Sequence, residues 1–166
     1  MSKPLILMGG GGHAAVLADC LLLLGGNVLG VIDPALIEGQ SWQFGIKVLG
    51  EENVVFKHSP DDIELVNGLG FIPPSRARRD LFQRWTENGY SFASVVHPSA
   101  IIGRDVVLSS GVQVLAGVII NKHHCSPITS LVRQVSSGAS EAIEIFEVTN
   151  LINCLKYFKK MGYLIL

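Results

Sequence analysis

The chain has 166 residues, of which 48% are hydrophobic, a formal net charge of -1 and three cysteines. This length suits one ordinary domain or two small ones, and the near-neutral charge argues against nucleic acid as a partner. Asp19 interrupts the longest apolar stretch, so no membrane span is expected, and the N-terminus is typical of a first strand and not of a signal peptide. Because the odd cysteine count includes no Cys-x-x-Cys spacing, we expect a reducing, cytoplasmic compartment.

Residues 1–92 are predicted to form a Rossmann-like α/β domain with a parallel sheet. The apolar run 5–8 ends at glycines, as a buried parallel strand does. The next predicted elements are a helix over 14–24, a strand over 28–32, an extended piece over 45–50, a strand over 63–69 and a helix over about 76–88. This last helix is expected to bury Leu81, Phe82 and Trp85. Alternation of strand and helix is typical of a small parallel α/β domain.

A six-residue period replaces this pattern in residues 93–121. Two series carry it: Ala100, Val106, Val112 and Val118, and Ile102, Leu108, Val114 and Ile120. A period of six fits neither a helix nor a plain strand. It is typical of a parallel β-helix, in which each hexapeptide forms one face of a three-sided coil and stacks its aliphatic residue inside. A pair of ordinary β-hairpins with coincident spacing is the alternative.

The six-residue register fails after Asn121, so residues 122–166 are interpreted as a divergent tail with a predicted helix near 140–161. The sequence leaves three roles open for this tail: it caps the coil, packs at a subunit interface, or folds poorly. Adjacent His123 and His124 on an extended chain point to opposite sides, so at most one aligns with Cys125 and no metal site is expected. A Cys–His nucleophile pair is the remaining alternative there.

The glycine loop after the first strand carries the clearest chemical signal. Gly9, Gly11 and Ala14 match G-x-G-x-x-A, in which glycines let backbone N–H groups reach a pyrophosphate at a helix N-terminus. Asp33 follows the second strand, where an acidic residue hydrogen-bonds a ribose hydroxyl. Tight strand–helix packing is the alternative for the glycines, and His13 is either a donor to a phosphate or hydroxyl, or a polar cap residue. Since only one mononucleotide-sized half precedes the repeat, a sugar nucleotide is favoured over a nicotinamide dinucleotide.

A second group of residues follows the strand predicted over 63–69. Gly68 and Gly70 end that strand, and Arg76, Arg78 and Arg79 crowd the first turn of the next helix. Arginines beside a glycine loop offer bidentate contact to phosphate. An ordinary solvated helix face is the alternative.

Together, the loop 9–13, Asp33, the segment 68–78 and the repeats over 97–121 resemble the NeuD/PglD-type bacterial sugar O- and N-acyltransferases. The resemblance implies that the N-terminal domain holds a nucleotide-linked or free sugar. The residues that it assigns to this site are Gly9, Gly11, Gly12, His13, Asp33, Gly70 and Arg78. It further implies a left-handed β-helix that forms a homotrimer, acetyl-CoA as the acetyl donor, no metal, and a product used in cell-surface glycan synthesis.

The resemblance does not extend to the later coils, where the family's general base is a histidine followed by an acidic residue. His123 and His124 arrive almost a full coil too early, so no catalytic residue is assigned. Residues 122–166 are therefore expected to be a truncated or divergent replacement, which leaves the activity of this chain alone open. A non-catalytic sugar-nucleotide-binding module and an NAD-binding oxidoreductase fragment are the competing functions.

Overall fold

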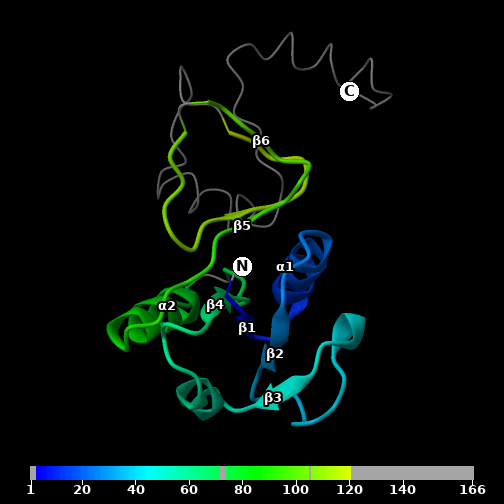
Figure 1. Ribbon diagram of the computed structural model, residues 1–166, viewed down its shortest axis with the longest axis vertical. Coiled ribbons are helices and arrows are strands. Elements are labelled where there is room, and N and C mark those ends of the chain that lie inside the picture. Colours follow the sequence, from blue (N-terminus) through cyan, green and yellow to red (C-terminus); the bar gives the residue numbers. More distant parts are fainter. Residues whose placement is uncertain (1–2, 72–73, 105, 121–166) are drawn as a thin grey trace.

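The computed structural model describes residues 3–71, 74–104 and 106–120 (Figure 1). The tail over 122–166, with its predicted helix and with His123, His124 and Cys125, lies outside the described residues. The described helices are α1 (Gly12–Leu23), α2 (Ala77–Glu87) and the short 3-10 helices η1 (Gln43–Gly45) and η2 (Glu52–Lys57). No helix in these segments is long and apolar enough to cross a membrane.

The predicted parallel sheet is present and has the strand order β3-β2-β1-β4. Its strands are β1 (Leu5–Met8), β2 (Val28–Ile32), β3 (Val48–Gly50) and β4 (Glu64–Asn67). All three strand pairs run parallel, and β1 lies in the interior of the sheet, between β2 and β4. After α2 the chain returns beside β4 through a single parallel bridge between Leu65 and Phe92.

Helices cover both faces of the sheet, which explains why β1 is apolar throughout (Figure 1). Successive side chains of a strand point to opposite faces. Leu5 and Leu7 therefore pack in the cluster that contains the buried residues of α1, while Ile6 and Met8 pack with the buried residues of α2. Each face of the sheet thus buries its own apolar layer.

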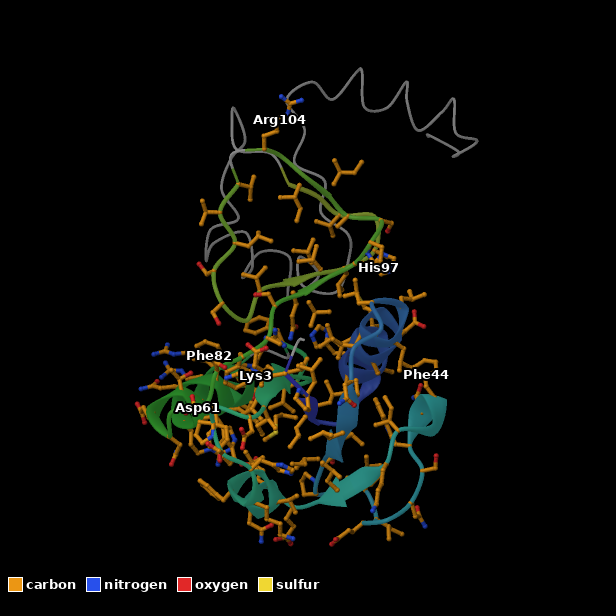
Figure 2. The ribbon with its side chains drawn as sticks, in the orientation of Figure 1. Lys3, Phe44, Asp61, Phe82, His97 and Arg104 are labelled. Atoms are coloured by element: carbon orange, nitrogen blue, oxygen red, sulfur yellow. The ribbon has the colours of Figure 1, made fainter. Side chains whose placement is uncertain are left out.

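The face that α2 presents to the sheet is narrower than the sequence predicts. Leu81 and Trp85 are 6% and 2% exposed, but Phe82 is 39% exposed, so the prediction that Phe82 is buried was wrong. Leu81 and Trp85 are four residues apart and share one helix face, whereas Phe82 points about 100° away from Leu81. Phe82 lies on the side of α2 nearer the coil, where its ring packs on Phe92 with 4.7 Å between the centroids (Figure 2).

Beyond the sheet, the chain winds through one full turn of a coil and into a second, with short parallel strands paired between the turns (Figure 1). These strands are β5 (Val95–Val96), β6 (Ile101–Ile102), β7 (Gln113–Val114) and β8 (Ile119–Ile120). β5 pairs with β7 and β6 pairs with β8, each in parallel, so that Val95 lies opposite Gln113 and Ile101 opposite Ile119. Partners are separated by three hexapeptides, as expected for a three-sided coil, whereas a hairpin would pair its strands antiparallel.

Burial in the coil follows the six-residue period. Val114, a member of the repeat series, is 3% exposed, and its series partners Ile102 and Leu108 are half-buried. Ile101 and Val107, which lie between repeat positions, are 55% and 91% exposed. The repeat residues thus point into the coil and their neighbours point out of it.

Candidate functional site

The candidate site lies where the loops after β1 and β4 meet. Met8 and Asn67, the last residues of these strands, are parallel partners. From β1 the chain passes to β2 and β3, which lie on one side of β1 within the sheet, and then to β4, which lies on the other side of β1. This is a topological switch point, and ligands of parallel α/β sheets bind outside the carboxyl ends of the strands at such points.

Gly9 and Gly68 bring the two loops into backbone contact. Gly9 has a φ of +106°, which a residue with a side chain rarely adopts. A Cβ atom at Gly68 would lie 2.8 Å from the carbonyl oxygen of Gly9 and 2.9 Å from Cβ of Ala14. At these two positions glycine is needed for close packing.

Gly11 and Gly12 have a different environment. Apart from the adjoining residues and the backbone of α1, no described heavy atom lies within 4 Å of the position that a Cβ atom would take at either residue. Gly11 is the N-cap of α1, and within the described chain no side chain caps that helix. The first backbone N–H groups of a helix carry partial positive charge and bind anions. The start of α1 therefore offers a backbone surface that an anionic group can approach closely.

Asp33 holds the glycine loop from the end of β2. Its Oδ2 accepts a hydrogen bond from the N–H of Gly10 at 2.7 Å, and its Oδ1 accepts one from Ala35 N–H at 2.8 Å. Trp42, which the sequence did not single out, donates from Nε1 to the carbonyl of Gly10 at 3.1 Å. Asp33 thus lies beside the loop, and its two described partners are backbone groups.

Arg78 points from the first turn of α2 toward the loop after β4. Its Nη1 donates to the carbonyl oxygens of Leu69 and, at 3.2 Å, of Asn67. Asn67 is 5% exposed, and its Nδ2 donates back to the carbonyl of Arg78 at 2.9 Å. Arg76 and Arg79 are exposed, so Arg78 is the arginine of this turn that the fold directs toward the site.

Gln113 reaches this group of residues from β7 of the coil. Its Oε1 accepts a hydrogen bond from Nη2 of Arg78 at 2.7 Å and lies 2.8 Å from Nε2 of His13, while its Nε2 donates to the carbonyl of Asn67 at 2.8 Å. His13 lies in the first turn of α1, and the position of a Cβ at exposed Gly70 is 3.6 Å from its Cβ. The sheet domain and the coil are therefore joined by side chains at the candidate site itself.

Asn67 and Gln113 were not anticipated as site residues, although each carries a sequence signal. Asn67 is a polar residue that ends the apolar strand β4, directly before Gly68. Gln113 is a polar residue between Val112 and Val114, two members of the repeat series. Polar side chains at otherwise apolar positions need partners. The Asn67 amide finds them in backbone groups of Arg78 and Leu69, and the Gln113 amide in the Arg78 guanidinium and the backbone carbonyl of Asn67.

Two other kinds of chemistry find no support in the described segments. No group of three or more His, Cys, Asp or Glu side chains there is arranged to hold a metal ion. Cys20 is 1% exposed in α1, and burial, with a contribution from Asp19, raises the pKa of its thiol. A buried, protonated thiol is a poor nucleophile.

The comparisons with known proteins agree with this geometry. Residues 4–85 match the family model of the PglD N-terminal domain. These residues are therefore similar to the N-terminal domain of the NeuD/PglD-type sugar acetyltransferases. A comparison with curated protein sequences finds no match.

Solved structures of sugar acetyltransferases share the fold. PerB from Caulobacter crescentus, solved with CoA and GDP-perosamine, is 30% identical with a TM-score of 0.60, over 72% of this chain and 54% of PerB. A mutant of the perosamine N-acetyltransferase from the same organism, also solved with CoA and GDP-perosamine, gives 30% identity and a TM-score of 0.61 over the same shares.

The acetyltransferase domain of PglB from Neisseria gonorrhoeae, in complex with acetyl coenzyme A, is similar in fold at 22% identity and a TM-score of 0.60. That match covers 72% of this chain and 56% of the PglB domain. The chain therefore spans about half the length of these relatives.

Proposed function

We propose that the N-terminal domain, residues 1–92, binds a nucleotide-linked sugar at the start of α1. The observation that carries this proposal is the open backbone at Gly11 and Gly12, at the positive end of a helix and at the switch point of the sheet. The diphosphate of a sugar nucleotide carries the negative charge that such a backbone surface attracts. GDP-perosamine, the ligand present in the PerB structure, belongs to this chemical class.

The other predicted site residues fit the same ligand. Each carboxylate oxygen of Asp33 accepts one described hydrogen bond and has capacity for another, so a ribose hydroxyl can donate to it as well. Gly70 is exposed beside His13, which leaves room for a ligand next to the imidazole. Arg78 supplies positive charge near both loops.

We further propose that the protein is an acetyl-CoA-dependent acetyltransferase that modifies a sugar hydroxyl or amine for cell-surface glycans. The match to the PglD N-terminal domain supports this activity, together with the CoA and acetyl coenzyme A in the relatives' structures. In this proposal, residues 93–121 begin a left-handed β-helix that assembles a homotrimer, and 122–166 form a separate C-terminal segment. We assign neither the general base nor a coenzyme-binding residue within 3–71, 74–104 and 106–120.

Calorimetric titration with GDP- and UDP-linked amino sugars and with NADH tests the binding proposal. We expect the nucleotide sugars to bind and NADH not to bind. Gly12→Ala places a methyl group on the open backbone, and should weaken nucleotide-sugar binding at least about tenfold while the protein stays as stable as wild type. Exposed Gln83 on α2 provides a control variant, Gln83→Ala, which should bind normally. Binding of NADH without binding of any nucleotide sugar would overturn the proposal in favour of a dinucleotide site.

Release of free thiol from acetyl-CoA in the presence of an amino-sugar nucleotide tests the catalytic proposal. Turnover that depends on both substrates supports the acetyltransferase. Tight nucleotide-sugar binding with no thiol release would instead identify a non-catalytic binding module.

A further inference from the structure

Two obligate partners fix the orientation of the Gln113 side-chain amide. Its Nε2 lies 2.8 Å from the carbonyl oxygen of Asn67, which only accepts hydrogen bonds. Its Oε1 lies 2.7 Å from Nη2 of Arg78, which only donates them. Rotating the amide by half a turn would place oxygen against oxygen and nitrogen against nitrogen. The orientation with Oε1 toward Arg78 is therefore the favourable one.

This orientation determines the role of the nearest histidine nitrogen. Oε1 of Gln113 has no hydrogen to donate, so His13 Nε2, at 2.8 Å, makes a hydrogen bond only if it carries a proton. Arg78 Nη1 lies 3.2 Å from the same nitrogen, but it also donates to the carbonyls of Leu69 and Asn67. The arginine is therefore satisfied without using Nε2 as an acceptor.

We infer that Gln113 is a positioning residue for the candidate site: it holds His13 with Nε2 protonated and the Arg78 guanidinium in place. Gln113 belongs to the coil, whereas His13 and Arg78 belong to the sheet domain. The hydrogen bonds of this one side chain thus join the coil to the sheet domain, keep a proton on Nε2 of His13 and orient the guanidinium of Arg78. As a site for sugar nucleotides, this arrangement rests on the function proposed above.

The inference changes the role expected of His13. An imidazole that donates from Nε2 to Gln113 does not use the same N–H for a phosphate. Diphosphate contacts at this end of α1 therefore come from the backbone N–H groups of the loop.

Nitrogen-15 NMR of histidine side chains in the full chain tests the protonation state directly, without any ligand. The sequence has five histidines, and a His13→Gln variant identifies the signals of His13. We expect Nε2 of His13 to give the signal of a protonated ring nitrogen in the wild type. Gln113→Glu keeps an acceptor at Oε1 and should keep that signal. Gln113→Leu removes the acceptor and should shift protonation toward Nδ1, whereas exposed Gln83→Leu should change nothing.

Two results would contradict the inference: an unprotonated Nε2 in the wild type, or a His13 signal that stays unchanged in Gln113→Leu. A change in the circular dichroism of Gln113→Leu would show that the leucine disturbs folding. In that case Gln113→Glu tests the inference instead, because loss of the His13 Nε2 proton in that variant also contradicts it.

Nucleotide-sugar titration separates this inference from the proposed function. We expect Gln113→Leu to bind GDP- or UDP-linked amino sugars about threefold to tenfold more weakly than wild type, because His13 and Arg78 lose the hydrogen bonds that hold them in place. If the wild type binds none of them, the proposed function fails while the NMR result still decides the role of Gln113 toward His13. If the wild type binds and Gln113→Leu binds equally well, the positioning role fails while the proposed function stands.

Discussion

The carboxylate of Asp33 accepts a hydrogen bond from the backbone N–H of Gly10 at 2.7 Å. The contact forms because Met8 and Ile32, the last residues of β1 and β2, are parallel partners, so the chain segments that follow them emerge side by side. A residue that the sequence pattern assigns to a ribose thus also shapes the loop that would face the phosphates. In the proposed function, ligand binding and loop conformation would therefore depend on the same carboxylate.

Asp33→Ala should therefore impair both stability and binding. It leaves the N–H groups of Gly10 and Ala35 without their acceptor, so we expect the free energy of unfolding to fall by about 1–3 kcal/mol and nucleotide-sugar binding to be lost. Asp33→Asn retains one acceptor oxygen, so it should lose less stability and less nucleotide-sugar affinity than Asp33→Ala. Urea denaturation and calorimetric titration measure the two effects, and normal binding by Asp33→Ala would show that the carboxylate is dispensable to the site.

Gly68→Ala and Gly12→Ala should differ sharply in stability. A Cβ at Gly68 would lie 2.8 Å from Gly9 O and 2.9 Å from Met8 O, and backbone atoms of the sheet cannot move aside easily. We expect Gly68→Ala to lower the free energy of unfolding by about 1–3 kcal/mol or more. Gly12 has open space around it in the first turn of α1, so Gly12→Ala should leave stability unchanged or slightly raised. Equal stability of the two variants would contradict the packing described for the loops.

The sequence predicted those elements whose conformation depends mainly on residues close to one another in the chain. The apolar run ending in glycines marks β1 and its loop, and the six-residue period predicts partners three hexapeptides apart, as in the pairing of Val95 with Gln113. Arg78 could be placed near the site because it follows the loop after β4 closely along the chain. Its contact with Gln113, 35 residues away, depends on how the coil is seated against the sheet, which no local pattern specifies.

The error at Phe82 has a related cause. Phe82 was expected to be buried because its side chain is apolar. Its position around the axis of α2, however, decides whether that side chain packs against the sheet. We expect Leu81→Ala to lower the free energy of unfolding by about 2–4 kcal/mol, because it removes a side chain that is 6% exposed. Phe82→Ala should cost clearly less, since that ring is 39% exposed and loses its contacts with Phe92 and with the coil beside Gly111. A larger loss for Phe82→Ala in chemical denaturation would restore the original prediction.

The coil offers a comparison of an inward and an outward valine. Val114 is 3% exposed and Val107 is 91% exposed. Val114→Asp would bury a carboxylate inside the coil and should destabilise the coil by more than about 2 kcal/mol. Val107→Asp places the carboxylate in solvent, so its stability should stay within about 0.5 kcal/mol of wild type. Amide hydrogen exchange reports this locally, because the N–H groups of Val95 and His97 donate to the carbonyls of Val112 and Val114. Protection of these two amides should be lost in Val114→Asp and kept in Val107→Asp, and the opposite order would show that the inward and outward positions are reversed.

Tyr90 should make stability depend on pH at the alkaline end. Its side chain is 4% exposed, its hydroxyl donates to the carbonyl of His58 at 2.9 Å and lies 3.2 Å from that of Val55, and burial raises its pKa. An unfolded tyrosine ionises near pH 10, so above that pH the unfolded state loses this proton before the folded state does. The unfolded state then binds fewer protons, and the free energy of unfolding falls as the pH rises from about 10 toward the pKa in the folded state.

Tyr90→Phe should lower the free energy of unfolding by about 1 kcal/mol at pH 7 through the lost hydrogen bond. This stability deficit relative to wild type should shrink above pH 10, because only the wild type loses stability there. Urea denaturation of both proteins between pH 7 and pH 11 measures the difference. A constant or growing deficit would mean that the hydroxyl ionises at least as readily in the folded protein as in the unfolded chain, which contradicts the raised pKa.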